Sequence, residues 1–184
     1  HWPICRGRLV VIPQSNVQGL AANTRYMPKV PEEQRDLNRN FPSPKYAEAP
    51  RGTAATALWE FVQEIRPDWV LDLHEGYEFN ISHDPGPGRY KSVGSSLIYR
   101  SDPMLDPIAE QMAEAVNATV ENPDRKFVLL RRGPKETTLV HACIERLGIP
   151  GMILETTYKD QPLSLRTRQH RTMVQVAMQH LGML

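Results

Sequence analysis

The chain has 184 residues, of which 40% are hydrophobic, so it is long enough for one domain with a sizeable apolar core. Its 22 Lys and Arg residues against 21 Asp and Glu residues leave a net charge of +1, without the basic excess that is typical of proteins that bind nucleic acid or an anionic membrane. No apolar run approaches the roughly 20 residues that cross a bilayer, and no signal-peptide pattern opens the chain. We expect one domain over residues 1–184, with neither nucleic acid nor a membrane as partner.

The first part of the chain predicts a short strand, a long irregular segment and a helix. Arg8–Pro13 is an apolar run stopped by proline, which is typical of a short buried strand. From Gln14 to Gly52, five prolines and the lack of an apolar period predict a long loop, and loops of this length are commonly functional. Thr53 then suits the N-cap of a helix that stops before Pro67. Its expected apolar face is Leu58, Phe61, Val62 and Ile65.

The remaining chain alternates short apolar runs with helical patterns. The predicted strands are Trp69–Glu75, Ser96–Tyr99, Lys126–Leu130 and Gly151–Glu155. The predicted helices begin near Asp106, near Leu139 and at Leu163. In the last of these, Arg166 and His170 are expected to face outward. Strands that alternate with helices indicate an α/β fold with a mixed, largely parallel sheet flanked by helices on both sides.

Two of the predicted strands end in ionisable side chains, His74 and Glu155. In open α/β sheets ligands bind at the carboxyl ends of strands. A neutral imidazole can bind zinc, and a nearby carboxylate can take a proton from zinc-bound water, whose pKa falls to about 7. The sequence therefore indicates a hydrolytic pair with zinc as cofactor. Simpler structural readings stay open, in which His74 caps its strand and Glu155 is a paired structural carboxylate.

The long loop adds groups that suit an acidic substrate. Arg39 presents a planar fork that pairs with a carboxylate through two hydrogen bonds, and the adjacent Asn38 can add a third. Arg25 could polarise a scissile carbonyl and hold the oxyanion that develops from it, an effect worth about 3 kcal/mol per donor. A surface turn with a local ion pair is the simpler interpretation of Asn38 and Arg39.

Four segments together resemble the successive motifs of a known family. They are Asn23–Tyr26, Asp36–Pro42, Asp72–His74 and Ile153–Glu155. Their order and spacing are similar to those of the zinc carboxypeptidase superfamily, with the nearest likeness to its succinylglutamate desuccinylase and aspartoacylase branch. The resemblance covers roughly residues 8 to 158, and it implies the α/β fold of that superfamily.

By this resemblance, the chain would be a zinc-dependent hydrolase that cleaves an amide bond next to a substrate carboxylate. His74 would be a zinc ligand and Glu155 the general base that activates water. Arg25 would polarise the carbonyl, and Asn38 with Arg39 would hold the carboxylate. The partner would be a small molecule or a peptide with a free carboxylate, cleaved by a metallocarboxypeptidase or an N-acyl-amino-acid deacylase.

The sequence departs from the family at both ends. The family's first two zinc ligands come from an H-x-x-E motif, and none of the six histidines here is followed three positions later by glutamate. His141 and Glu145 are four apart on a helix that is expected mainly to pack, so they are not a replacement. We interpret the fold as truncated at its N-terminus and expect the chain alone to be poorly active or inactive. The 29 residues after Glu155 are enough for one closing helix, whereas aspartoacylase relatives usually add a small β-rich domain. We therefore expect a carboxypeptidase or amidase that acts on a peptide rather than on a small acyl-amino acid.

A nonenzymatic reading also stays open, in which the chain is a metal-free module, or an inactive fragment, that binds carboxylates through Arg25, Asn38 and Arg39. A serine hydrolase would need G-x-S-x-G after a strand, and a dinucleotide-binding fold would need G-x-G-x-x-G after the first strand. Neither string occurs.

Cys5 and Cys143 lack metal-type spacing, and we expect both to be free thiols. The compartment and the oligomeric state stay open.

Overall fold

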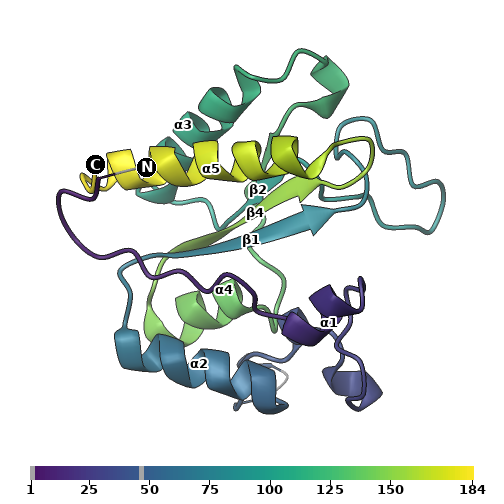
Figure 1. The fold of residues 1–184 in the computed structure, drawn as a ribbon, viewed down its shortest axis with the longest axis vertical. Helices are drawn as coiled ribbons and strands as arrows, with labels where there is room; N and C mark the ends of the chain where they lie inside the picture. Colours follow the sequence, from purple (N-terminus) through teal and green to yellow (C-terminus); the bar gives the residue numbers. More distant parts are fainter. Residues whose placement is uncertain (1–2, 46–47) are drawn as a thin grey trace. The chain divides into compact units, whose positions relative to one another are not determined.

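The computed structural model of the chain describes residues 3–45 and 48–184 (Figure 1). The chain forms two compact units. Unit 1 contains His1–Arg8, Leu71–Gly133 and Met152–Leu184. Unit 2 contains Leu9–Val70 and Pro134–Gly151. A single catalytic domain over residues 1–184 stays a prediction.

Unit 1 is built on a four-stranded sheet in the order β1-β4-β2-β3. The strands are β1 (Val70–Gly76), β2 (Ser96–Ile98), β3 (Val128–Leu130) and β4 (Gly151–Thr157), of which only the first residues of β1 and β4 fall in unit 2. β2 runs parallel to β3 and antiparallel to β4. The mixed, mostly parallel α/β sheet predicted from the sequence is confirmed.

Parallel pairing of β1 with β4 follows from the hydrogen bonds at their two ends. Val70 N–H donates to Pro150 O at 3.0 Å, and Tyr158 N–H donates to Gly76 O at 2.8 Å. In a parallel ladder a residue bonds to the neighbours of the residue opposite it, so both bonds give the same register. This register fixes which side chains of the two strands share a face.

Two long helices of unit 1, α3 (Leu105–Asn117) and α5 (Leu163–His180), pack against each other (Figure 1). α3 buries Ile108, Met112 and Val116, which recur every four residues on one face of the helix. Its first N–H groups are satisfied by Asp102, whose Oδ1 accepts from Leu105 N at 2.7 Å. The helix predicted to begin near Asp106 starts at Leu105, and Asp106 lies in its first turn.

Asp106 accepts a hydrogen bond from the hydroxyl of Tyr99 at 2.7 Å, from the first turn of α3. Tyr99 is fully buried, and burial together with this bond raises the pKa of its phenol.

The expectation that Arg166 on α5 faces outward was wrong, because Arg166 is 8% exposed. A charged side chain is buried at this depth only when it is paired, and Arg166 pairs with Glu75 of β1.

Unit 2 is mainly helical. Its elements are α1 (Val17–Ala21), the 3-10 turns η1 (Glu32–Gln34) and η2 (Leu37–Arg39), α2 (Thr53–Ile65), α4 (Leu139–Ala142) and the π-helical turn η4 (Cys143–Leu147). The helix predicted after Gly52 is confirmed, although Thr53 is its first residue and Gly52 its N-cap. Gly148 has φ 67° after η4, as a left-handed C-terminal residue does.

The core of unit 2 forms between α2, η2 and the α4–η4 segment. Trp59 and Val62 of α2 are buried there, whereas three of the four residues expected on its apolar face are only half-buried. The members of this core are Leu37, Phe41, Ala55, Trp59, Val62, Ala142, Cys143 and Ile149. η2 is therefore fixed by its own Leu37, and this matters because Asn38 and Arg39 follow directly.

The strand expected over Arg8–Pro13 is not formed, and its apolar residues are 40% to 65% exposed. An apolar run becomes a strand only where a neighbouring strand pairs with it, and the four-stranded sheet of the described residues does not include this segment. Cys5 and Cys143 are free thiols, as expected.

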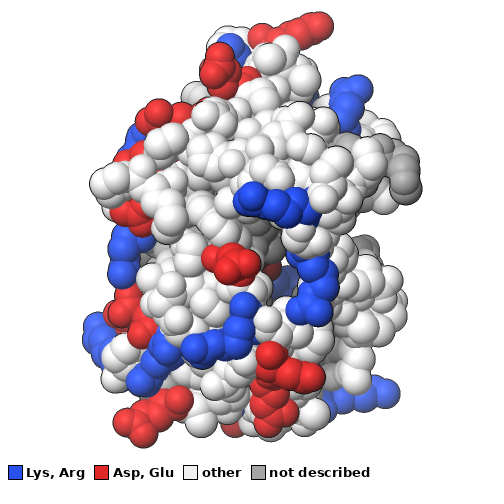
Figure 2. Space-filling view, turned by 90° about the vertical axis from the view of Figure 1, so that its left-hand side faces the viewer, with Lys and Arg blue, Asp and Glu red and all other residues white. Residues whose placement is uncertain are grey.

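Surface charge is mixed on the face that Figure 2 shows, where Lys and Arg side chains (blue) alternate with Asp and Glu (red). This distribution agrees with the net charge of +1. Among the described residues, no helix is long and apolar enough to cross a membrane.

Candidate functional site

His74 and Glu155 lie opposite each other on neighbouring strands of unit 1. The register of β1 on β4 pairs Val70 with Gly151 and Gly76 with Thr157, which puts His74 level with Glu155. Side chains of residues that are opposite in a sheet project from the same face. The two ionisable groups that the sequence singled out are therefore brought together on one face at the carboxyl ends of two strands.

The environments of these two side chains differ. The His74 side chain is 25% exposed, and its Nε2 lies 2.9 Å from Oδ2 of Asp72, two residues earlier on the same face. A carboxylate in this position holds an imidazole in one orientation and one tautomer. Glu155 is buried, with 8% of its surface exposed.

A second histidine, His170 of α5, supports the end of β1 from the other side of the strand. Its Nε2 lies 3.1 Å from the backbone O of His74 and 3.2 Å from Oγ1 of Thr156. The carbonyl can only accept, so Nε2 carries the proton and donates it. Sequence analysis placed His170 on the outer face of its helix, and this was wrong. No sequence signal could have found it, because the burial of its neighbour Arg166, one helical turn earlier, is itself known only from the fold.

Arg166 and Glu75 form the other polar contact between α5 and β1. The guanidinium of Arg166 donates to Oε1 of Glu75 and lies over the ring of Tyr158, 4.9 Å from its centroid. The Nε of Arg166 is buried and has no hydrogen-bond partner among the described residues. These contacts hold the helix to the end of the strand that carries His74.

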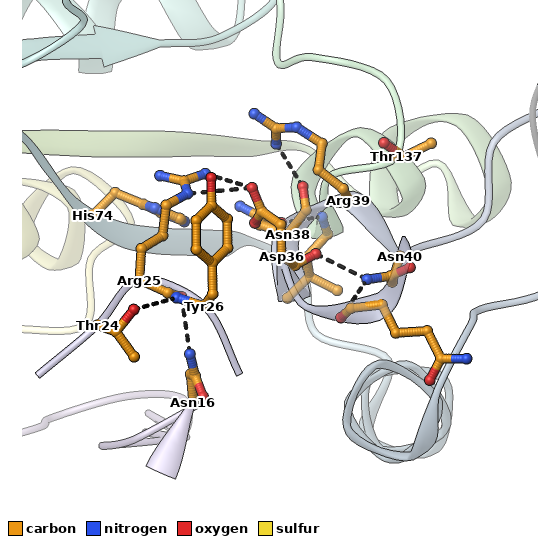
Figure 3. A network of polar contacts seen from close by, with 12 residues as sticks. Asn16, Thr24, Arg25, Tyr26, Asp36, Asn38, Arg39, Asn40, His74 and Thr137 are labelled. Atoms are coloured by element: carbon orange, nitrogen blue, oxygen red, sulfur yellow. Dashed lines mark hydrogen bonds and ion pairs between the residues drawn. The ribbon is translucent and has the colours of Figure 1, made fainter. Parts of the chain in front are cut away.

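In unit 2, Arg25 is held by the carboxylate of Asp36. Its Nε and Nη2 donate to the same oxygen, Oδ2, at 3.2 and 2.9 Å (Figure 3). The side chain of Arg25 is 51% exposed. The pair joins the start of the long loop to η2 and fixes the direction of the guanidinium.

Asn38 and Arg39 belong to η2 and have different surroundings. The Oδ1 of Asn38 accepts from Leu139 N at 2.9 Å, so it satisfies a free N–H at the start of α4. Arg39 Nη1 donates to Asn38 O at 2.6 Å, and its side chain extends away from Asn40 in Figure 3. Asn40 is buried and donates to two carbonyls, Gln34 O and Asp36 O, which fixes the shape of the loop.

Arg39 lines a hollow of about 380 Å³ together with Arg51, Lys135, Glu136 and Thr137. Arg51 donates from Nη2 to Arg39 O at 3.1 Å, which ties the two arginines together. Among the described residues, none of the three cations forms an ion pair of 4.0 Å or less. The sequence did not indicate Arg51 or Lys135, because no motif connects positions so far apart in the chain.

The described residues do not by themselves fit a zinc ion. A zinc site in a protein uses three or four protein ligands. No group of three or more His, Cys, Asp or Glu side chains in residues 3–45 and 48–184 could hold a metal ion. The carboxylate-held imidazole of His74 has the form of one such ligand, and one ligand binds zinc weakly.

The sequence resemblance is confirmed for the first part of the chain. Residues 5–80 match the model of the family described as the succinylglutamate desuccinylase/aspartoacylase catalytic domain. Among curated proteins, none matches the chain.

Solved structures with a similar fold come from Helicobacter pylori. The mDAP-bound form of Csd4, a D,L-carboxypeptidase, has 20% sequence identity and a TM-score of 0.63, over 81% of this chain and 38% of that chain. The tripeptide-bound Csd4 structure has 20% identity and a TM-score of 0.61, over 81% of this chain and 39% of that chain. The chain thus spans less than half the length of Csd4, and at this identity the likeness shows the fold alone.

Proposed function

We propose, on the premise that residues 5–80 are part of a succinylglutamate desuccinylase/aspartoacylase catalytic domain, that this chain contributes to a hydrolase that cleaves an amide bond next to a substrate carboxylate. The observation that carries the proposal is the register of β1 on β4, which brings His74 level with Glu155 on one face of the sheet. Csd4, with a similar fold, is a carboxypeptidase whose structures hold mDAP and a tripeptide. Both N-acyl amino acids and peptides fit the proposed reaction.

Each residue has a role that its surroundings support. Glu155 is buried and lies level with His74 on one face of the sheet, and as general base it takes the proton of the attacking water. Arg25, oriented by Asp36, donates to the carbonyl oxygen as negative charge develops there. Arg39, with Asn38, holds the substrate carboxylate.

Zinc is the family's metal, and when bound it would polarise the carbonyl and lower the pKa of water. His74 would supply one ligand, through the imidazole that Asp72 orients. Because the described residues offer no complete ligand set, no step here is derived through the metal. We expect the chain alone to hold less than one equivalent of zinc after dialysis, and a full equivalent that resists dialysis would overturn this expectation.

Hydrolysis of an N-acyl amino acid at saturating zinc tests the function, with release of the free amine as readout. We expect slow turnover that Glu155→Gln lowers by about 10²-fold or more, as loss of a general base does. Glu114→Gln is the matched control, because Glu114 is exposed on α3, and it should keep the wild-type rate. Equal rates for wild type and Glu155→Gln would refute the role of Glu155.

The second reading is a metal-free module that binds carboxylates, and the basic hollow around Arg39 favours it. A carboxylate ligand that binds with the same affinity with and without zinc, together with no turnover at saturating zinc, would replace the hydrolase by this module. Turnover that requires zinc would exclude it.

A further inference from the structure

The strand that carries His74, β1, has an open edge. In the sheet that the described residues form, β1 lies at one end of the order β1-β4-β2-β3, so it has a neighbouring strand on one side only (Figure 1). None of its residues is buried, whereas every residue of β4 is buried. The backbone N–H and C=O groups along such an edge can pair with a strand of another molecule.

The register of β1 on β4 shows which residues point to this edge. Val70 N–H and Gly76 O bond to the residues directly before and after β4. Backbone groups of successive residues point to opposite sides of a strand, so the even-numbered residues of β1 face β4. The odd-numbered residues face the open edge, and they are Leu71, Leu73 and Glu75. Among the described residues, no backbone hydrogen bond between segments uses their outward groups.

β1 lacks the features that protect natural sheet edges. Short strands, proline and lysine keep an edge from pairing, and β3, at the other end of the sheet, has only three residues. β1 has seven residues, more than the usual length of about five to six, and it contains neither proline nor lysine. Because Leu73 at its middle is also 50% exposed, this edge suits pairing with another strand.

The sequence of β1 is complementary to itself in one register. Two copies of a strand pair antiparallel about a two-fold axis, and such a contact closes on itself. An axis at Asp72 would put two carboxylates opposite each other, and an axis at His74 would put two imidazoles opposite each other. An axis at Leu73 puts Asp72 of one copy opposite His74 of the other. The same axis pairs the whole strand, with Val70 opposite Gly76.

The backbone and the side chains both permit this register. An axis at Leu73 pairs the odd-numbered residues with one another through their outward groups. Asp72 and His74 then occupy the closer, non-hydrogen-bonded positions, where Cβ atoms are about 4.5–5.5 Å apart. A carboxylate opposite an imidazole stabilises a strand pair, and symmetry makes this contact twice. On the other face Glu75 lies opposite Leu71, so no like charges meet.

We propose that β1 is a dimerisation edge, through which two copies of this chain pair antiparallel with the two-fold axis at Leu73 and Asp72 of each copy opposite His74 of the other. The two sheets join into one continuous sheet. The face that carries His74 and Glu155 continues across the axis, so each of these residue pairs lies beside the other copy. The dimer does not depend on the proposed hydrolysis.

Sedimentation equilibrium of the chain at a series of concentrations tests the dimer. We expect the mean mass to rise from that of the monomer toward twice that value between about 1 μM and 1 mM, because a contact of one strand pair is small and weak. EDTA in all samples excludes a metal ion shared by two copies as the cause of association. A monomer throughout this range would overturn the proposal and leave another protein or a further segment of the polypeptide as the occupant of the edge.

A lysine at the axis should weaken the dimer. Leu73→Lys puts two positive charges opposite each other, and we expect the dissociation constant to rise about tenfold or more. Leu163→Lys is the matched control, because Leu163 is 66% exposed at the start of α5, and it should dimerise as the wild type does. Equal effects of the two substitutions would overturn β1 as the contact.

Exchange of the two polar residues tests the register. His74→Asp puts two carboxylates opposite each other in both symmetric contacts, so the dissociation constant should rise about tenfold. The double variant Asp72→His, His74→Asp restores a carboxylate opposite an imidazole, and it should dimerise nearly as well as the wild type. Failure of the double variant to restore the dimer, with the fold intact by circular dichroism, would refute the register centred on Leu73.

Hydrogen exchange of the wild type, measured by NMR, gives a test that needs no variant and decides the matter if a variant does not fold. The amides of Leu71, Leu73 and Glu75 should exchange several-fold more slowly at high concentration than at low, because pairing protects the outward N–H groups. The amides of Asp72 and His74 face β4, so their exchange should not depend on concentration in the same way. Equal exchange of the outward amides at both concentrations would overturn strand pairing.

Discussion

The buried imidazole of His170 makes a specific prediction for acid stability. Its Nε2 donates to His74 O, so in the neutral ring Nδ1 carries no proton. Nδ1 is buried and has no partner among the described residues. Protonation would put a new N–H where nothing accepts it, and burial lowers the pKa of His170 to about 4.

The sign and size of the effect follow from linkage. In the unfolded chain a histidine titrates near 6.5, so between pH 6.5 and about 4 the unfolded state binds a proton that the folded state does not. The free energy of unfolding therefore falls as the pH is lowered through this window, and no further loss from this residue occurs below it. One pKa unit corresponds to 1.36 kcal/mol, so His170 accounts for at most about 3 kcal/mol.

Urea unfolding at several pH values between 4 and 7 measures this loss. His170→Gln keeps an N–H that can donate to His74 O and removes the titration, so its free energy of unfolding should fall less steeply than that of wild type. His180→Gln is the matched control, because His180 is an exposed residue at the end of the same helix. Parallel pH dependence in wild type and His170→Gln would refute the reasoning, as would an imidazole pKa near 6.5 by NMR.

Further predictions concern the stability of each unit and use urea unfolding at neutral pH. Trp59→Ala should lower the free energy of unfolding by about 3–5 kcal/mol, because it opens a cavity in the core of unit 2, and a loss below about 1 kcal/mol would contradict the packing. Asn38→Ala removes the acceptor of Leu139 N–H and should cost about 1 kcal/mol, whereas Asn38→Asp should keep most of it. Asp102→Ala should cost about 1 kcal/mol by the loss of the cap at Leu105, and Asp102→Asn should restore part of it.

Elements with a strong local pattern could be predicted from the sequence. The apolar run before His74 and the one before Glu155 both form strands, and the helix after Gly52 has nearly its expected bounds. In each case the apolar pattern of the element, a residue that favours its start and a residue that ends it all lie within about 15 residues of the chain. The expected strand at Arg8–Pro13 had the same local pattern and does not form, because a strand also needs a neighbour that local pattern does not specify.

Polar side chains in the interior could not be placed in this way. Arg166 and His170 look like an outer helix face by composition, and yet Arg166 pairs with Glu75 and His170 bonds to the carbonyl of His74. Burial of a charged group is favourable only when its partner is in place. Here the partner lies about 90 residues away in the chain. Local sequence patterns do not extend over such a separation, so they cannot predict the pairing. The pairing is thus a property of the fold.

The same argument separates two kinds of site residue. Asn38 and Arg39 could be found because they lie inside one contiguous string, whereas Arg51 and Lys135 share a hollow with Arg39 only after η2 and the segment before α4 have come together. A contiguous sequence motif is the part of a site that members of a family share, whereas the residues that the fold brings next to it can differ between members. Residues that line a hollow with a motif residue but lie outside the motif, as Arg51 and Lys135 do, can therefore be located only from the fold.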